Sequence, residues 1–172
     1  MNMTRCFQIG CGIIKQKNNT TKKPKTQRRV KTKMKKLALY YSFDAHTKRI
    51  AHEKSKDLKV DLLLEIKELK QRTKFNVMTS GAIEAIRMKK SEIESLDVNF
   101  DDYGTIIIFM PLWGGSPAPA MNSVIELIPK GKEVELYITS EKGDSARSAD
   151  NTSNEIQKRG SLVTKYVDLK IG

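Results

Sequence analysis

The sequence of 172 residues predicts an α/β protein with an open, doubly wound parallel sheet of five strands. From Met34 onward, short apolar runs alternate with longer segments of helical pattern, which is typical of βαβ units. The first of these runs, residues 37–41, is apolar throughout, as in a strand that is covered on both faces. The length suits one such domain and is too short for two.

The predicted elements follow one another in regular order after Met34. Residues 105–110 are the most strand-like run because they contain Ile106, Ile107 and Ile108 in succession. Prolines in the first turn favour a helix at 117–128, and Gly160 marks the end of a helix over 146–159. The predicted strands are 37–41, 60–66, 105–110, 134–139 and 162–167, and the predicted helices are 47–56, a short helix around 82–88, 117–128 and 146–159.

The final helix of a doubly wound sheet is missing from this sequence, because only residues 168–172 follow the last predicted strand. We therefore expect one face of the sheet to be partly uncovered. Such a face favours a homodimer through it, or a partner protein that docks there. A truncated gene product is the alternative explanation.

The positive charge is concentrated in the first 33 residues. The formal net charge is +12, yet residues 1–33 contain ten of the 32 Lys and Arg and no acid, so the remaining 22 face 20 Asp and Glu. A nearly neutral domain gives no reason to expect that it binds nucleic acid. Cys6 and Cys11 also lie in this segment, without the His or Cys partners that a metal site needs, so we expect no metal.

The chain divides into a disordered basic extension, 1–33, and a domain, 34–172. Residues 15–33 are polar and have no apolar periodicity, so they bury too little surface to become ordered. We hypothesise that Met34 is the biological start and that 1–33 is translated upstream sequence, since Arg28-Arg29 can be encoded by a ribosome-binding AGGAGG. A basic arm that docks on RNA or an acidic partner is the alternative.

The expected location is the cytoplasm, without a membrane anchor. No apolar run approaches the roughly 20 residues that span a bilayer. Residues 6–14 are the most apolar stretch near the start, but they lack the basic start and the cleavage site of a signal peptide.

The loop after the first strand has the composition of a phosphate-binding loop. In a doubly wound sheet, ligands lie beyond the carboxyl ends of the strands. Ser42 and Thr47 can donate hydrogen bonds to a phosphate, and the first amides of the following helix point at the same place. In the alternative interpretation, Ser42 or Thr47 caps the helix and nothing binds.

The loop after the third strand contains the only tryptophan of the chain, Trp113, followed by Gly114 and Gly115. A flat aromatic side chain there can stack on a planar ring, and glycines allow close backbone approach. Alternatively, Trp113 closes the end of the sheet as part of the core. The loop after the fourth strand, residues 139–145, is rich in hydroxyl groups and lies on the same edge.

Taken together, these segments resemble the flavodoxin family over residues 36–168. Residues 40–51 are similar to its strand, Ser-x-Thr-Gly-Asn-Thr loop and helix, and residues 102–119 are similar to its Tyr-Asp-x-Ile and Pro-x-Trp-x-Gly-x-x-x-Pro segments. The resemblance implies the strand order 2-1-3-4-5 and flavin mononucleotide (FMN) as the cofactor. It places Ser42, Asp44, His46 and Thr47 at the phosphate, Pro111, Leu112, Trp113 and Gly114 beside the isoalloxazine, and Thr139, Ser140 and Gly143 on its far side.

Two substitutions depart from the family pattern at the phosphate end. Asp44 replaces a neutral threonine, and a carboxylate about 5 Å from a phosphate charge costs on the order of 3 kcal/mol at an effective dielectric near 20. Ala45 replaces glycine and adds strain if the position needs a positive φ. Lys48 and Arg49 are close enough in sequence to offset part of the charge of Asp44. We therefore expect weakened FMN binding.

The function that the resemblance implies is electron transfer by an FMN-binding protein to redox partner proteins. An FMN-dependent NAD(P)H:quinone-type oxidoreductase is one alternative, and a degenerate, cofactor-free binding module is the other. The sequence marks no catalytic residues: it has no triad and no paired acid–base carboxylates.

Overall fold

The computed structural model describes residues 34–141, 143 and 145–171. The expectations for the basic extension 1–33, including Cys6 and Cys11, lie outside these residues. Within the described part of the chain, no helix is long and apolar enough to cross a membrane.

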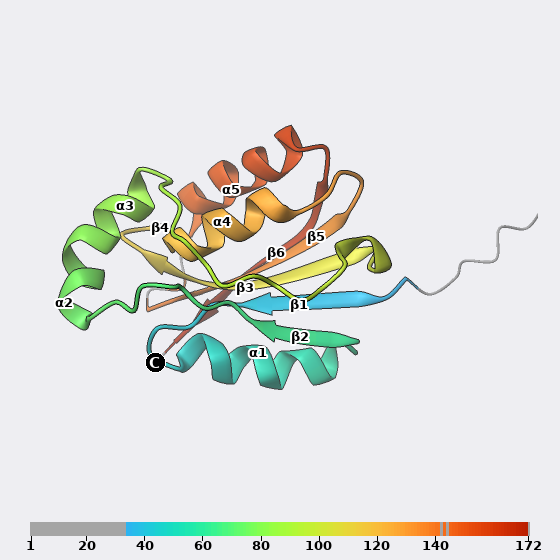
Figure 1. The fold of residues 1–172 in the computed structure, drawn as a ribbon, viewed down its shortest axis with the longest axis horizontal. Coiled ribbons are helices and arrows are strands. Elements are labelled where there is room, and N and C mark those ends of the chain that lie inside the picture. The colour runs from blue at the N-terminus through green and yellow to red at the C-terminus, as the bar shows by residue number, and fades with distance from the viewer. Residues whose placement is uncertain (1–33, 142, 144, 172) are drawn as a thin grey trace, which may run out of the picture. The chain divides into compact units, whose positions relative to one another are not determined.

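Five parallel strands form the sheet, in the order β2-β1-β3-β5-β6 (Figure 1). They are β1 (Lys36–Tyr40), β2 (Leu62–Glu65), β3 (Thr105–Trp113), β5 (Glu133–Ser140) and β6 (Leu162–Lys170). This confirms the predicted order 2-1-3-4-5 for the parallel strands. A further two-residue strand, β4 (Ser116–Pro117), pairs antiparallel with the end of β3 and was not predicted.

The helices connect these strands in chain order. They are α1 (His46–Asp57), α2 (Lys74–Asn76), the π-helical η1 (Val77–Gly81), α3 (Ala82–Ile86), the 3₁₀-helical η2 (Phe100–Asp102), α4 (Pro119–Leu127) and α5 (Ala146–Lys158). The short helix predicted around 82–88 in fact begins at Lys74 and includes a π-helical turn. Its start is fixed by Thr73, whose side chain accepts a hydrogen bond from the Asn76 amide at 3.3 Å.

One face of the sheet is packed against α3, α4 and α5. Alternate side chains of β1 and β3, such as Leu37, Ile106 and Ile108, are fully buried on this face, against Met121 of α4 and Ile156 of α5. Such continuous burial explains why the strands read as uninterrupted apolar runs.

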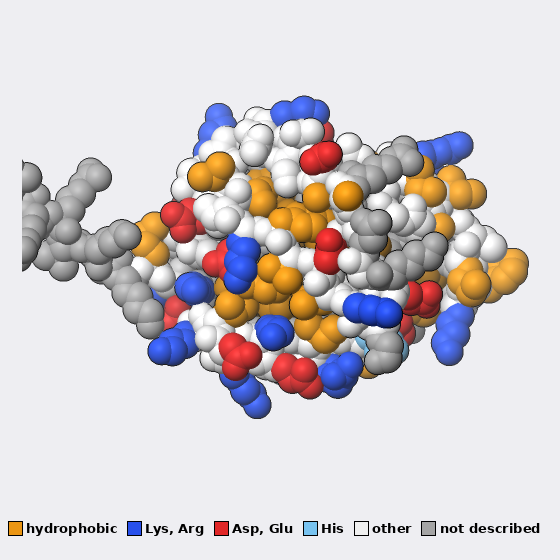
Figure 2. All heavy atoms as spheres, turned by 180° about the vertical axis from the view of Figure 1, so that it is seen from behind, with side chains coloured by type: hydrophobic (Ala, Val, Ile, Leu, Met, Phe, Trp, Pro, Cys, Tyr) orange, Lys and Arg blue, Asp and Glu red, His pale blue; other side chains and the backbone are white. Residues whose placement is uncertain are grey.

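The opposite face is covered by α1 alone among the described helices. Ala38, Ile107 and Phe109 of the sheet pack there with Ile50 and Ala51 of α1. Several apolar side chains on this face are only half-buried, among them Val167, Leu169 and Ile171 at the end of the described chain. Seen from behind the view of Figure 1, hydrophobic side chains gather in the middle of the surface between charged ones (Figure 2). Within the described residues, this face is therefore partly uncovered, as expected.

Candidate functional site

The carboxyl ends of β1, β3 and β5 meet at one edge of the sheet. The loops that follow them are therefore neighbours, although they lie far apart in the sequence. A hydrogen bond of 2.7 Å between the hydroxyl groups of Thr47 and Thr139 joins the first to the third of these regions.

The loop between β1 and α1 contains a left-handed turn directly before the helix. Ala45 precedes the helix with φ 67° and ψ −8°, in the left-handed region that favours glycine. The position that is glycine in the flavodoxin motif therefore requires the conformation that glycine adopts without strain. Neither Ser42 nor Thr47 caps the helix; instead, a carboxylate oxygen of Asp44 accepts a hydrogen bond from the His46 amide at 3.2 Å.

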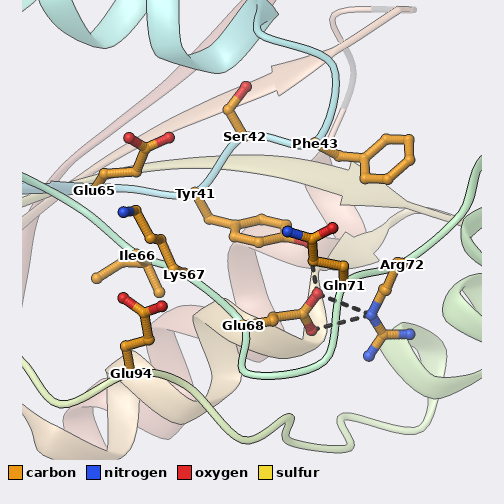
Figure 3. Close-up of a pocket in the computed structure, with 10 residues that line it drawn as sticks. All are labelled: Tyr41, Ser42, Phe43, Glu65, Ile66, Lys67, Glu68, Gln71, Arg72 and Glu94. Carbon is orange, nitrogen blue, oxygen red and sulfur yellow. Dashed lines mark hydrogen bonds and ion pairs between the residues drawn. The ribbon is translucent and has the colours of Figure 1, made fainter.

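Ser42 carries a buried hydroxyl group without a protein partner. Its Oγ atom is shielded from solvent and has no hydrogen-bond partner among the described residues. A buried hydroxyl normally finds a partner, because leaving it unpaired costs about 1–3 kcal/mol. Ser42 also lines a cavity, although its hydroxyl group points towards α1 and away from the other lining residues (Figure 3).

The cations near Asp44 are paired with other carboxylates. Lys48 contacts Glu65 at 3.2 Å, and Arg49 contacts Glu53 at 3.5 Å. Among the described residues no ion pair of Asp44 is present. Lys48 and Arg49, which the sequence suggested would offset the charge of Asp44, therefore pair with other carboxylates instead.

Thr47 and Thr139 are each 1% exposed, and their hydroxyl groups bond to protein. The Thr139 hydroxyl donates to the carbonyl of Met110 at 3.3 Å, so its oxygen accepts from Thr47. Both side chains fasten the first and third loops to the end of β3. Contact of either hydroxyl with a ligand stays a prediction and would require that chain of bonds to open.

Trp113 is packed into the core with only 8% of its surface exposed. The rings of Tyr41 and Phe43 meet it edge-on, with centroids at 5.8 and 6.2 Å. The guanidinium carbon of Arg72 lies 5.5 Å from the centre of the indole ring. A Cβ atom added to Gly81 would come within 3.3 Å of the indole, so the backbone of η1 also covers it. Stacking of Trp113 on a flavin stays a prediction, and these groups would have to move first.

Arg72 is held over Trp113 by two carboxylates. Its Nε donates to both oxygens of Glu68, at 2.9 and 3.0 Å, and its Nη1 donates to Glu84 at 2.8 Å. The Tyr41 hydroxyl donates to the same Glu68 at 2.7 Å. Burial, together with this bond to a carboxylate, raises the pKa of Tyr41 well above its ordinary value, so it stays a donor. Glu68 and Arg72 have side chains only 5% and 15% exposed, so this is a largely desolvated cluster.

Pro111, Leu112 and Trp113 belong to β3 and not to a loop, which corrects the sequence prediction. β1 ends opposite Phe109, so the side of β3 beyond that point is free to pair with β4. Gly114 and Gly115, with φ of 59° and 78°, form the two-residue turn between these strands. A Cβ on Gly114 would lie 3.0 Å from the Cδ1 atom of Ile86 in α3 and would also be strained by the positive φ, so glycine is favoured there.

The third loop is fastened to β6. The amide of Gly143 donates to the Ser140 hydroxyl at 3.0 Å, and Gly143 itself has φ 67°. The Ser145 hydroxyl bonds to Tyr166 at 2.7 Å and to the Asp168 carboxylate. Ser140 and Gly143 therefore lie at the predicted edge of the sheet, where they form a hydrogen bond with each other.

A cavity of about 350 Å³ lies beside the first loop (Figure 3). Tyr41, Ser42 and Phe43 line it from the end of β1, and the Glu68–Arg72 cluster lines it from the segment after β2. An antiparallel bridge between Glu68 and Ile93 holds that segment in place. Of the site residues predicted from the sequence, Ser42 alone lines this cavity.

Sequence reasoning missed Glu68, Arg72 and Glu84. They lie among many charged residues in 65–94, and a buried charge cannot be told from a solvated one by residue type. The β3–β4 hairpin was also missed, although its signal was present, since a Gly-Gly dipeptide is typical of this turn.

No protein-family model and no curated protein matches the sequence. Solved structures do match the fold. A flavoprotein from Lactobacillus acidophilus NCFM, solved in complex with FMN, has a TM-score of 0.65 at 23% identity, over 77% of this chain and 91% of that chain. Putative flavoproteins from Bacteroides eggerthii DSM 20697 and Bacteroides uniformis ATCC 8492 both give a TM-score of 0.68. Their identities are 22% and 21%, over 78% and 77% of this chain and 87% and 88% of theirs.

The fold of this chain is therefore the flavodoxin-like fold, as the resemblance of its sequence motifs implied.

Proposed function

We propose that this protein is a flavin-binding electron-transfer protein of the flavodoxin type. The observation that carries the proposal is the unpartnered, buried hydroxyl of Ser42. It lies at the carboxyl end of β1, beside a left-handed turn and the N-terminus of α1, where a doubly wound sheet binds its ligands. The flavin-containing neighbour of the same fold, from Lactobacillus acidophilus, supports the choice of ligand.

The polar end of the proposed site fits a flavin better than the region around Trp113 does. Ser42 supplies a free hydroxyl group, and the first amides of α1 keep no helical partner. The side chains over Trp113 would have to open for the ring to stack. When bound, a flavin supplies one- or two-electron transfer; the chain contributes a hydrophobic wall and a polar edge that hold it. Its partners would be redox proteins that exchange electrons with it.

The test is reconstitution of the purified full chain with flavin, followed by flavin fluorescence. We expect quenching on binding and a visible absorption band that stays with the protein through gel filtration. Ser42→Ala removes only the unpartnered hydroxyl, so it should weaken binding without lowering stability. Ser95→Ala, at an exposed position outside the cavity, is the matched control. A chain that retains no flavin would contradict the proposal.

A cofactor-free binding module is the second candidate, and the burial of Trp113 at 8% exposure favours it. The two candidates predict different behaviour of that side chain. A flavin site quenches the fluorescence of Trp113, the only tryptophan, when flavin is added, whereas a cofactor-free module leaves it unchanged. An NAD(P)H:quinone-type oxidoreductase is distinguished from both by flavin-dependent oxidation of NADH or NADPH.

We further propose that the sheet face beyond α1 mediates a homodimer. Val167, Leu169 and Ile171 are half-buried there and pack beside the apolar cluster of this face. A second copy of the same face would bury this apolar surface by a two-fold contact.

Sedimentation of the full chain tests the dimer. We expect Leu169→Glu to yield a monomer, because a buried charge without a partner is costly in such a contact. Phe75→Glu, at a hydrophobic side chain that is 75% exposed in α2, should leave the assembly unchanged. A wild-type monomer at high concentration would exclude the dimer.

A further inference from the structure

Asp44 makes the phosphate end of the proposed flavin site anionic before any ligand binds. Its carboxylate oxygen accepts the His46 amide, the first N–H of α1, at 3.2 Å. Unpaired amides of a helix start are the groups that bind a phosphate, and the helix dipole favours one negative charge at that place. Here the protein supplies that charge itself.

We propose that Asp44 takes the place of the ligand's phosphate, so that this site selects a flavin without a phosphate, of the riboflavin class. The inference rests on the proposed function, since it concerns which flavin the site takes.

Among the residues that the structure describes, no cation forms an ion pair with the carboxylate. Lys48 and Arg49, the basic residues closest to it in α1, contact Glu65 and Glu53. A phosphate monoester carries about −1.5 to −2 at neutral pH and would meet Asp44 directly. The repulsion would act between partly solvated groups, because Asp44 is exposed, so salt should screen it.

The remaining polar group of this end suits a neutral ligand. The unpartnered Ser42 hydroxyl can donate to, or accept from, a sugar-alcohol hydroxyl of a ribityl chain. Riboflavin has the ring and ribityl chain of FMN but no phosphate, so it would bring no charge towards Asp44.

The experiment compares titrations of the full chain with riboflavin and with FMN, followed by fluorescence quenching. We expect riboflavin to bind at least as tightly as FMN. The Asp44→Asn variant keeps an oxygen for the His46 amide and removes the charge, so FMN should bind about tenfold more tightly while riboflavin changes less than about threefold. Asp97→Asn, an equal change of charge at an exposed position in the segment before β3, should alter neither.

A salt series on the wild type gives a second measurement that needs no variant. Added salt should tighten FMN binding towards that of riboflavin, because screening weakens the repulsion. Wild-type preference for FMN by about tenfold or more, or an unchanged ratio of the two affinities in Asp44→Asn, would overturn the inference while leaving flavin binding intact. Flavin binding by neither protein would overturn the proposed function and this inference together; FMN binding only by Asp44→Asn would support both.

Discussion

The β1–α1 loop and the β3–β4 hairpin lie at the same edge of the sheet but keep different parts of the flavodoxin pattern. In the loop, the backbone follows the expected path, with Ala45 in the left-handed conformation, while the side chain of Asp44 would repel a phosphate in the proposed site. In the hairpin, the characteristic side chain is present, but Trp113 is covered by Arg72, Phe43 and the backbone at Gly81.

This difference separates two things that a motif can preserve. A turn is determined by a few adjacent residues, so its backbone path carries over with the local sequence. The accessibility of a side chain depends on residues from elsewhere in the chain, such as Arg72 and the η1 segment, which the motif does not contain. The loop is therefore the more reliable part of the resemblance. The hairpin residue Trp113 is explained by its packing in the core and gives little information about ligand binding.

The largest expected effect tests whether Trp113 is part of the core. Trp113→Ala should lower the free energy of unfolding by about 3–5 kcal/mol, because it removes a large side chain that is 8% exposed and leaves a cavity. Denaturant unfolding followed by circular dichroism measures this loss.

Phe75→Ala is the matched control, since this aromatic side chain is 75% exposed and should change stability by less than about 0.5 kcal/mol. A loss below about 1 kcal/mol in Trp113→Ala would mean that the indole contributes little to the core, and the contrast between the two regions would disappear.

The second prediction tests the cluster that covers the indole. Arg72→Met should destabilise the protein by about 3 kcal/mol, because Glu68, whose side chain is 5% exposed, would keep a buried charge without its partner. The emission of Trp113 should also change, since the guanidinium lies 5.5 Å from its ring.

Arg87→Met controls for the loss of a positive charge, because Arg87 is exposed and makes no ion pair with a described residue. Equal stabilities for the Arg72 and Arg87 variants would show that the ion pairs of Arg72 do not stabilise the packing over Trp113. The double change Glu68→Gln with Arg72→Met should recover part of the loss, because it removes both charges together.

The sequence predicted the sheet well because the buried strands consist of apolar residues, which can be recognised by residue type. Ile106, Ile107 and Ile108 are all fully buried, so a continuous apolar run identified a strand that is covered on both faces. The helices α1, α4 and α5 were found within a few residues of their ends, since turns and prolines limit them locally.

The site could be predicted only in part. Ser42 follows directly from its place after β1, and it is the predicted residue with an unpartnered buried hydroxyl. Glu68 and Arg72 could not be found, because their burial results from a bridge to Ile93 and from the helical segment at 74–86. Charged residues are usually solvated, so residue type alone gives the wrong expectation for such a pair.

The third prediction concerns the hydrogen bonds that link the start of α1, through the end of β5, to β3. Thr139→Val and Thr47→Val each remove a buried hydroxyl from the chain that ends at the Met110 carbonyl, and each should cost about 1–2 kcal/mol. The double variant should lose less than the sum of both, by about 1 kcal/mol, since the two groups bond to each other. Additive losses in denaturant unfolding would show that the loops are independent.

The smallest effect tests the strain in the β1–α1 loop. Ala45→Gly should raise the free energy of unfolding by up to about 1 kcal/mol, because glycine adopts the observed φ of 67° without the clash of a Cβ atom. The same change at an ordinary helical position, Ala149→Gly in α5, should instead lower it by about 0.5–1 kcal/mol. If both substitutions destabilised the protein equally, position 45 would have right-handed backbone in solution. The loop would then lack the turn that makes it the more reliable part of the resemblance. A gain at position 45 alone would show that the chain keeps a glycine-type turn while carrying alanine.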